Sequence, residues 1–193
     1  MPQIKLHKIA SYISRNDCLS EQGIYNFENN SSSGKITVLS GASENIVYGV
    51  IPHVTDGIHF LDKKQGLHIV TRGKAGQLTY LPKSSYAANT NAFIIYLKDD
   101  QKEQLSIITD EDESYYLKFL KIFLEPKFLE ISSNSDVSVF PLTKVFEEFE
   151  IPHFILNDNM KDIVNKYEKI NLVKNFLFEH MIITQNLLDK EII

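Results

Sequence analysis

The sequence predicts an α+β fold, in which a β-rich globular domain with short helices is followed by one long helix. Two observations carry this prediction. In the N-terminal half, short runs of alternating apolar and polar residues are separated by Gly, Ser, Asn and Asp. From Asp158 to about Lys190 the chain contains neither Gly nor Pro, and its apolar residues recur at helical spacing. We therefore expect a domain at residues 1–156 and a helix at residues 157–193.

The composition is that of an ordinary folded protein. The 193 residues are enough for one domain with a core, and 43% of them are hydrophobic. No stretch approaches the roughly 20 apolar residues of a membrane helix, and the N-terminal residues lack the pattern of a signal peptide. The single cysteine, Cys18, excludes an intrachain disulfide and a cysteine-based zinc cluster. We expect a cytoplasmic protein that has no membrane partner.

The N-terminal half is expected to consist of short strands. Residues 3–15 have the pattern of a strand followed by a turn of helix. Three further strands are predicted at Lys35–Leu39, Ile46–Ile51 and Gly57–Leu61. At least three more follow in residues 66–98, where a polar loop from Ser84 to Asn91 precedes a buried last strand.

A basic glycine turn joins the first two strands of that last group. The alternation from Leu67 to Arg72 predicts a strand with two different faces. Gly73 and Gly76 bracket Lys74, and glycine takes the positive φ angles that a tight turn needs. The turn is therefore expected to present Arg72 and Lys74 at an exposed tip.

The pattern becomes helical after the strands. Thr109 followed by four acidic residues predicts a helix start with a capping hydroxyl, and Pro126 is expected to end this helix. A calcium loop is the alternative interpretation of the acidic run, but it lacks the glycine and the terminal glutamate of an EF-hand loop. Pro141–Phe149 then predicts a short helix, and Ile151–Leu156 a strand interrupted by Pro152.

The long helix has two interpretations. It is either packed along its own domain, or it is an arm that pairs with another helix as an antiparallel coiled coil. About 30 helical residues span about 45 Å, more than a domain of this size requires, and a second apolar flank at Phe176, Phe178 and Ile182 also favours the arm. Asn157 or Asp158 is expected to cap this helix. The heptad positions expected to face a partner helix are Met160, Ile163, Tyr167, Ile170, Leu177, Met181 and Leu188.

Charge is unevenly distributed along the chain. The formal net charge of −5 argues against a protein that coats nucleic acid through bulk electrostatics. Between residues 60 and 85, however, Asp62 is the only acid. The basic residues of this stretch are Lys63, Lys64, Arg72, Lys74 and Lys83. A local basic patch of this kind is sufficient for a face that reads DNA.

No residue pattern supports catalysis. A P-loop, a methyltransferase glycine loop with its N-P-P-Y motif and a G-x-S-x-G elbow are absent from the sequence. We interpret His53, His59 and His68 as surface or strand-face histidines, because no carboxylate accompanies them at metal-ligand spacing. A nuclease site on Asp112 and Glu125–Lys127 is an alternative, but this E-x-K pattern closes a predicted helix instead of lying on a strand. We predict no metal and no cofactor.

Three segments, taken in order, carry a resemblance to a known family. They are IVTRGKAGQLTYLPKSSYAANTNAFIIYL (69–97), SYYLKFLKIFL (114–124) and FPLTKVFEEFEIPHF (140–154). In their order and spacing, followed by the long helix, the chain resembles one half of a DNA-specificity subunit of Type I restriction–modification systems. Such a half consists of one target recognition domain and one helical spacer. The chain departs from the family at Ile151–Phe154, where the second proline of I-P-x-P is missing, and in having one domain and one helix in place of two.

The resemblance implies a protein that catalyses nothing itself. The domain would read a half-site of double-stranded DNA, and the helix would pair with a second copy of the chain or with a second half-subunit. Modification subunits would bind this assembly and flip the target adenine, with the restriction subunit as a further candidate partner. The alternative is a protein-interaction or anti-restriction module that uses the same scaffold without reading DNA.

The candidate DNA contacts fall into three groups. Arg72 and Lys74 on the glycine turn are the strongest, since arginine binds guanine through two hydrogen bonds and lysine more often anchors phosphate. Lys63, Lys64 and Lys83 are candidates for phosphate neutralisation. The candidates on loops are Ser40, Ser43, Asn45, Tyr48, Ser85, Tyr86, Asn89 and Asn91. The alternative for the two last asparagines is that they satisfy backbone groups in a turn.

Overall fold

The computed structural model describes residues 2–20, 23–24, 35–41, 46–52, 57–72, 74–133 and 140–191, without the side chains of residues 133, 142 and 183–191. Its strands are β1 (Gln3–Lys5), β2 (Ala10–Ile13), β3 (Lys35–Leu39), β4 (Val47–Pro52), β5 (Phe60–Val70), β6 (Leu78–Ala88), β7 (Ala92–Leu97) and β8 (Glu150–Pro152). Its helices are α1 (Leu6–Ile9), α3 (Asp99–Lys102), α4 (Asp110–Ser133), α5 (Leu142–Glu148) and α6 (Asp158–Glu191).

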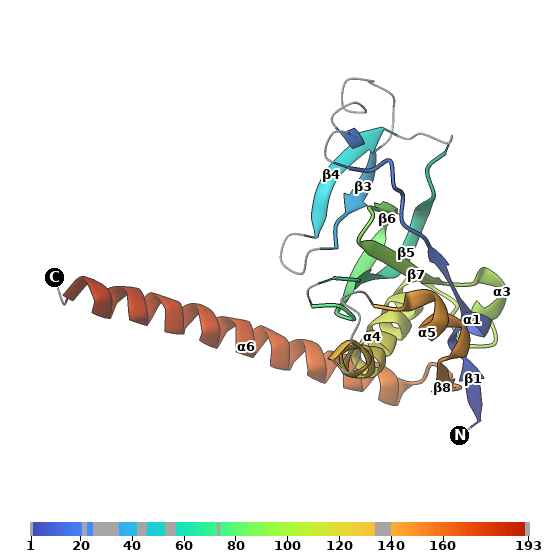
Figure 1. Cartoon of the computed structure of the whole chain (residues 1–193). Coiled ribbons are helices and arrows are strands. Elements are labelled where there is room, and N and C mark those ends of the chain that lie inside the picture. The colour runs from blue at the N-terminus through green and yellow to red at the C-terminus, as the bar shows by residue number, and fades with distance from the viewer. Residues whose placement is uncertain are drawn as a thin grey trace.

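One six-stranded sheet forms the centre of the domain. Its strand order is β2-β7-β5-β6-β3-β4, and all neighbours are antiparallel except β3 and β6, which run parallel. A separate antiparallel pair, β1 and β8, joins the N-terminal segment to the residues that precede α6. In Figure 1 the helices α1, α4 and α5 gather at one end of the domain and β3 and β4 form the other end.

The helices bury one face of the central strands. Leu67 of β5 shares a fully buried apolar cluster with Tyr116 and Phe128 of α4. The next residue along β5, His68, points to the opposite face because side chains alternate along a strand. This second face is also buried, around an apolar cluster that includes Ile94 of β7. The sheet therefore has apolar packing on both sides at its centre.

β5 and β6 bend near their middle. Lys63 has a positive φ of 50°, and the register between the two strands shifts on both sides of Lys64. A Cβ atom on Gly66 would stand 2.8 Å from the carbonyl oxygen of Ile95, so glycine permits the close approach of β5 and β7. Both halves of β6 pair with β5, and the second half also pairs with β3 on its other side.

Two strand boundaries around the bend differ from the prediction. The strand expected at Gly57–Leu61 is the start of β5, which continues through the bend to Val70. The polar segment Ser84–Ala88 belongs to β6 and not to a loop, because β3 and β5 lie on its two sides and satisfy its backbone groups. Only residues 89–91 form the turn before β7. The positive φ expected at Gly76 is confirmed, at 90°.

The start of α4 is confirmed. The Thr109 hydroxyl accepts a hydrogen bond from the backbone N–H of Asp112 at 3.1 Å, and the Asp112 carboxylate accepts one from the backbone N–H of Thr109 at 3.2 Å. This reciprocal arrangement satisfies two N–H groups that the helix itself leaves unpaired.

The predicted end of α4 is wrong. Pro126 lies inside the helix, which runs on to Ser133. Phe128 explains the continuation, because its ring is fully buried and packs against the rings of Phe140 and Phe149. The burial of this aromatic side chain offsets the helical hydrogen bond that a proline removes.

Replacing Pro126 by alanine is expected to stabilise the protein. The position is exposed, so alanine restores a backbone donor for the carbonyl of Ile122 without changing the core. The free energy of unfolding should rise by about 1–2 kcal/mol, less than the full penalty of a helix-interior proline because alanine also frees the unfolded chain. Urea unfolding of both proteins measures the difference. An unchanged or lower free energy of unfolding in the alanine variant would show that the path of the α4 helix axis depends on the proline.

The later elements follow the prediction more closely. α5 occupies Leu142–Glu148, and β8 covers only the first part of the strand predicted up to Leu156. The side-chain oxygen of Asn157 accepts a hydrogen bond from the backbone N–H of Met160 at 3.0 Å. Asn157 is therefore the cap of α6.

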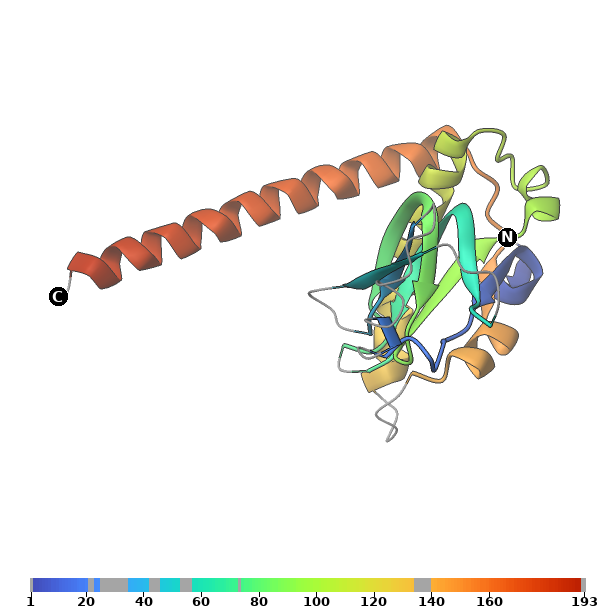
Figure 2. The ribbon, with the colours of Figure 1, turned by 90° about the horizontal axis from the view of Figure 1, so that it is seen from above.

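Among the described residues, only the first turns of α6 contact the domain. Met160 and Val164 are buried there, and the Lys161 ammonium lies 2.7 Å from the Asp112 carboxylate of α4. This ammonium holds the pKa of Asp112 at about 2. Figures 1 and 2 both show the remainder of α6 projecting from the domain, so the helix is not packed along its own domain. No helix within the described residues combines the length and the apolarity that crossing a membrane requires.

Candidate functional site

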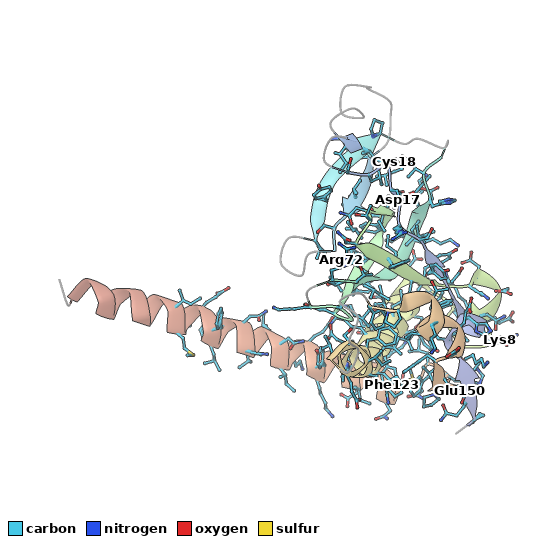
Figure 3. The ribbon with its side chains drawn as sticks, in the orientation of Figure 1. Lys8, Asp17, Cys18, Arg72, Phe123 and Glu150 are labelled. Carbon is cyan, nitrogen blue, oxygen red and sulfur yellow. The ribbon has the colours of Figure 1, made fainter. Side chains whose placement is uncertain are left out.

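Basic side chains from three separate elements line one open pocket of about 330 Å³. Arg15 follows β2, Arg72 follows β5 and Lys144 lies in α5. The neutral polar residues that line it include Thr90, Asn91 and Thr143. We call this site the basic pocket, since none of the described residues that line it is acidic. In Figure 3, Arg72 lies far from Lys8 and Glu150, which mark the other side of the domain.

A buried asparagine fixes the backbone beside Arg15. The Asn16 side chain donates hydrogen bonds to the carbonyl oxygens of His59 at 2.8 Å and Ala88 at 3.0 Å, and it accepts one from the backbone N–H of His59 at 2.7 Å. All hydrogen-bonding groups of this side chain are thus used to hold the segment after β2 against the end of β6.

Thr71 has the same role beside Arg72. Its hydroxyl donates a hydrogen bond to the carbonyl oxygen of Asn91 at 2.7 Å, and its own carbonyl accepts one from the backbone N–H of Phe140 at 2.9 Å. Residue 71 therefore connects the end of β5 to the 89–91 turn and to the segment that leads into α5.

Two of the three lysines predicted to neutralise phosphate have acidic partners. Lys64 lies 2.5 Å from Asp99, and Lys83 lies 2.7 Å from Asp110. Within the described part of the chain, by contrast, no acidic group lies within salt-bridge distance of Arg72.

The two sets of basic residues are also well separated. Asp110, which pairs with Lys83, is the first residue of α4, whereas Gly76 of the basic turn lies against the carbonyl of Phe128, 18 positions further along the helix. At 1.5 Å per residue these points are about 27 Å apart. Lys63, Lys64 and Lys83 therefore lie at the bend of β5 and β6, and they do not form one patch with Arg72 and Lys74.

The segment that follows β3 lies beside the basic pocket. A Cβ atom on Gly41 would stand only 2.2 Å from the carbonyl oxygen of Asn91. The Ser40 carbonyl lies 2.7 Å from Nε2 of His68. Burial lowers the pKa of His68 to about 4, so the imidazole is neutral and donates its Nε2–H to this carbonyl. His68 lies on a strand as predicted, but it is completely buried and not a surface residue.

The other predicted contacts differ in exposure. Tyr48 is exposed on β4, and Asn91 is partly exposed at the basic pocket. Four of the predicted contacts are buried and hydrogen-bonded within the domain: Ser40, Ser85, Tyr86 and Asn89. The Asn89 side-chain oxygen accepts from the backbone N–H of Asn91, which is the turn role given above as its alternative. Ser43 and Asn45 lie outside the described residues.

Sequence reasoning missed two of the three cations in the pocket. Arg15 and Lys144 are far from Arg72 in the chain, and only the tertiary structure brings the three residues together. One weak signal was available for Lys144, which is the only lysine or arginine in the segment 140–154, among three glutamates. No signal of this kind marked Arg15.

The projecting part of α6 is a second candidate surface. Ile170, Leu177 and Met181 are 64%, 56% and 70% exposed, and a group of large apolar side chains at such exposure is characteristic of interaction surfaces. Other large apolar residues in this part of α6 are exposed as well: Leu172, Val173, Phe176, Phe178 and Ile182.

Two of the predicted heptad residues contact the domain itself. Met160 belongs to the domain core, and the Lys121 ammonium of α4 lies 5.8 Å from the ring centre of Tyr167. The surface available to a partner helix therefore begins later along α6, beyond the turns that pack on α4. The side chain of Leu188 lies outside the described residues.

The alternative nuclease residues do not assemble into a metal site. Asp112 serves the helix cap and pairs with Lys161, while the Glu125 carboxylate accepts a hydrogen bond from the backbone N–H of Leu78 at 2.8 Å and pairs with Lys121. In the part of the chain that the structure describes, no three His, Cys, Asp or Glu side chains are grouped to hold a metal ion.

Comparison with known proteins gives matches only among solved structures, since no family model and no curated protein matches this chain. The S subunit of a Type-I restriction-modification system from M. genitalium is 16% identical, with 88% of this chain and 38% of that chain covered and a TM-score of 0.49. The HsdS subunit from Thermoanaerobacter tengcongensis is 13% identical, with 89% and 37% covered and a TM-score of 0.49.

A third match carries the structural comparison. It is a chain from a study of complex assembly and conformational transition of the type I R-M system, 14% identical, with 91% of this chain and 39% of that chain covered and a TM-score of 0.57. The α+β fold with a β-rich domain and a long C-terminal helix is thus shared with a chain of such a system, as the sequence resemblance predicted. The protein described here spans about two-fifths of the length of these solved chains.

Proposed function

We propose that this chain is a DNA-recognition half-subunit of a restriction–modification system. Residues 1–156 read a half-site of double-stranded DNA, and residues 157–193 pair with a second helix. The chain itself catalyses no reaction. Modification subunits of the adenine methyltransferase class act on the DNA that the assembly selects, and the restriction subunit is a further partner of the same assembly. The fold shared with a chain of a type I R-M system supports this assignment.

The basic pocket is the observation that carries the proposal. In a chain of net charge −5, it gathers three cations where the described lining residues include no acid. Asn91 of the 89–91 turn lines the pocket. It lies beside Gly41, in the segment that follows β3. A basic site that anchors the DNA backbone, next to polar loops that contact base edges, is the arrangement that sequence-specific DNA readers require.

Selection from a random duplex pool tests this function. The 193-residue chain is incubated with its modification subunit at low salt, and bound duplexes are sequenced. We expect enrichment of a short motif, repeated as an inverted pair if two copies of the chain bind together. An unenriched pool under these conditions would refute the DNA-reading function.

The exposed apolar face of α6 supports the pairing of two copies. Ile170, Leu177 and Met181 recur at heptad spacing along one side of the helix. Two antiparallel copies related by a twofold axis would place the same apolar face of each helix against the other. The side chains of both faces would then be removed from water. The assembly would then present two recognition domains, one for each half-site.

A protein-interaction or anti-restriction module is the second candidate function. The net charge of −5 favours it, because such a module has no need of a basic surface. The same pool experiment separates the two functions: a module of this kind would capture the modification subunit and enrich no DNA sequence.

A further inference from the structure

We propose that the basic pocket is a phosphate site, in which Arg15, Arg72 and Lys144 together hold one phosphodiester group of the DNA backbone. Arg72 is then an anchoring residue and not a reader of guanine. This inference rests on the proposed function, since bound DNA supplies the phosphate. It reverses the role that the sequence suggested for Arg72 and adds two residues that the sequence did not identify.

The arrangement of the cations favours an anion over a base edge. Guanine O6 and N7 are neutral acceptors that one guanidinium satisfies through two hydrogen bonds. Here two arginines and one lysine line the same open pocket, so a single base would leave two of these cations without a counter-charge. A phosphodiester carries a full negative charge and several acceptor oxygens, which suits convergent donors. The hydroxyl groups of Thr90 and Thr143 add neutral donors of the kind that contact phosphates.

The charges in the pocket are available to a ligand. Within the described residues, neither Arg72 nor Lys144 lies within 4 Å of an acidic group. Arg15 lies 3.5 Å from Asp17, and both side chains of this pair are more than half exposed. An exposed pair at this distance contributes little free energy, so Arg15 can exchange its partner for a phosphate at low cost.

The backbone beside each cation is held before any ligand arrives. Asn16 fixes the segment after β2, and Thr71 fixes the end of β5. Val145 is buried in the core beside Lys144. Because these anchors fix the spacing of the three cations, binding a phosphate orders only the ends of the side chains, which lowers the entropic cost of binding.

The test compares variants that remove one charge. Arg72→Gln and Lys144→Gln are measured in the full-length chain with its modification subunit, on a preferred and a scrambled duplex, over a range of salt concentrations. We expect each variant to weaken binding about tenfold on both duplexes alike, and to lower the slope of log K against log salt by about 1. Lys8→Gln is the matched control, since this exposed lysine lies on the other side of the domain from Arg72 (Figure 3), and both quantities should be unchanged.

Arg72→Lys separates anchoring from reading. A phosphate accepts lysine as a cation, so this variant should keep the base preference and bind within about threefold of the native chain. Guanine recognition through two parallel hydrogen bonds from one planar group depends on the fork of arginine, which lysine does not reproduce. Loss of base preference in Arg72→Lys, or a changed preference with an unchanged salt slope in Arg72→Gln, would overturn the phosphate site.

The outcomes also distinguish this inference from the proposed function. An enriched DNA motif together with salt slopes unaffected by Arg72→Gln and Lys144→Gln would retain the DNA reader and refute the phosphate site. Duplex binding that depends on these two residues but enriches no motif would retain the phosphate site and refute sequence-specific reading. A chain that binds no duplex at all would refute both.

Discussion

Replacing Leu177 and Met181 by aspartate is expected to weaken self-association of the chain by at least about 100-fold. Both side chains are more than half exposed in the single chain and lie on the heptad face of α6. In a paired helix they would be buried, and an unpaired carboxylate buried at such a seam costs several kcal/mol. Sedimentation should give the native protein the mass of a dimer, twice the 22.2 kDa of one chain. At the same concentration the double variant should have the mass of one chain.

Leu172→Asp provides the matched control for this experiment. Leu172 is 71% exposed on the same helix, but at 100° per residue it lies about 140–180° around the helix from Leu177 and Met181. The substitution introduces one aspartate, with the charge and the loss of helix propensity that each single change of the double variant brings. We expect the dimer to persist in this variant. If both variants sediment as monomers, the partner surface is not the heptad face. If the native protein itself sediments as a monomer, self-pairing is refuted.

Local rules predicted most elements of this fold because local chemistry determines them. The Thr109 cap, the Asn157 cap and the positive φ of Gly76 each depend on one residue and its immediate neighbours. The failures arise where tertiary packing overrides the local signal. Burial of Phe128 carries α4 past Pro126, and two neighbouring strands turn a polar segment into the end of β6.

The candidate site was less predictable than the fold for the same reason. Arg72 could be found because a glycine turn marks it in the sequence. Arg15 follows β2 and Lys144 lies in α5, and their meeting with Arg72 depends on contacts between segments that are distant in the chain, such as the hydrogen bond from the backbone N–H of Phe140 to the Thr71 carbonyl. The pairing of Lys64 with Asp99 of α3 is equally non-local, and no sequence pattern indicated it.

Acid is expected to destabilise this protein through His68. Burial lowers the pKa of this imidazole from 6.5 to about 4, so between these values the unfolded chain binds a proton that the folded chain does not. Stability therefore rises with pH across this window and falls as the pH is lowered through it. The loss amounts to about 3 kcal/mol over the window, at no more than about 1.4 kcal/mol per pH unit. Protonation also brings a charge into the apolar layer that holds the Ser40 carbonyl beside the basic pocket.

Urea unfolding of the native chain and of His68→Gln between pH 7.5 and pH 4.5 tests this origin of acid sensitivity. Glutamine keeps an N–H donor for the Ser40 carbonyl but does not titrate, so the pH slope should be smaller in the variant even if its stability at pH 7.5 is lower. His59→Gln controls for the loss of an imidazole at an exposed position. Asp112 does not interfere, because its lowered pKa of about 2 contributes stability that is lost only as the pH falls below about 4. An undiminished slope in His68→Gln would assign the sensitivity to other groups and leave the buried imidazole without a role in it.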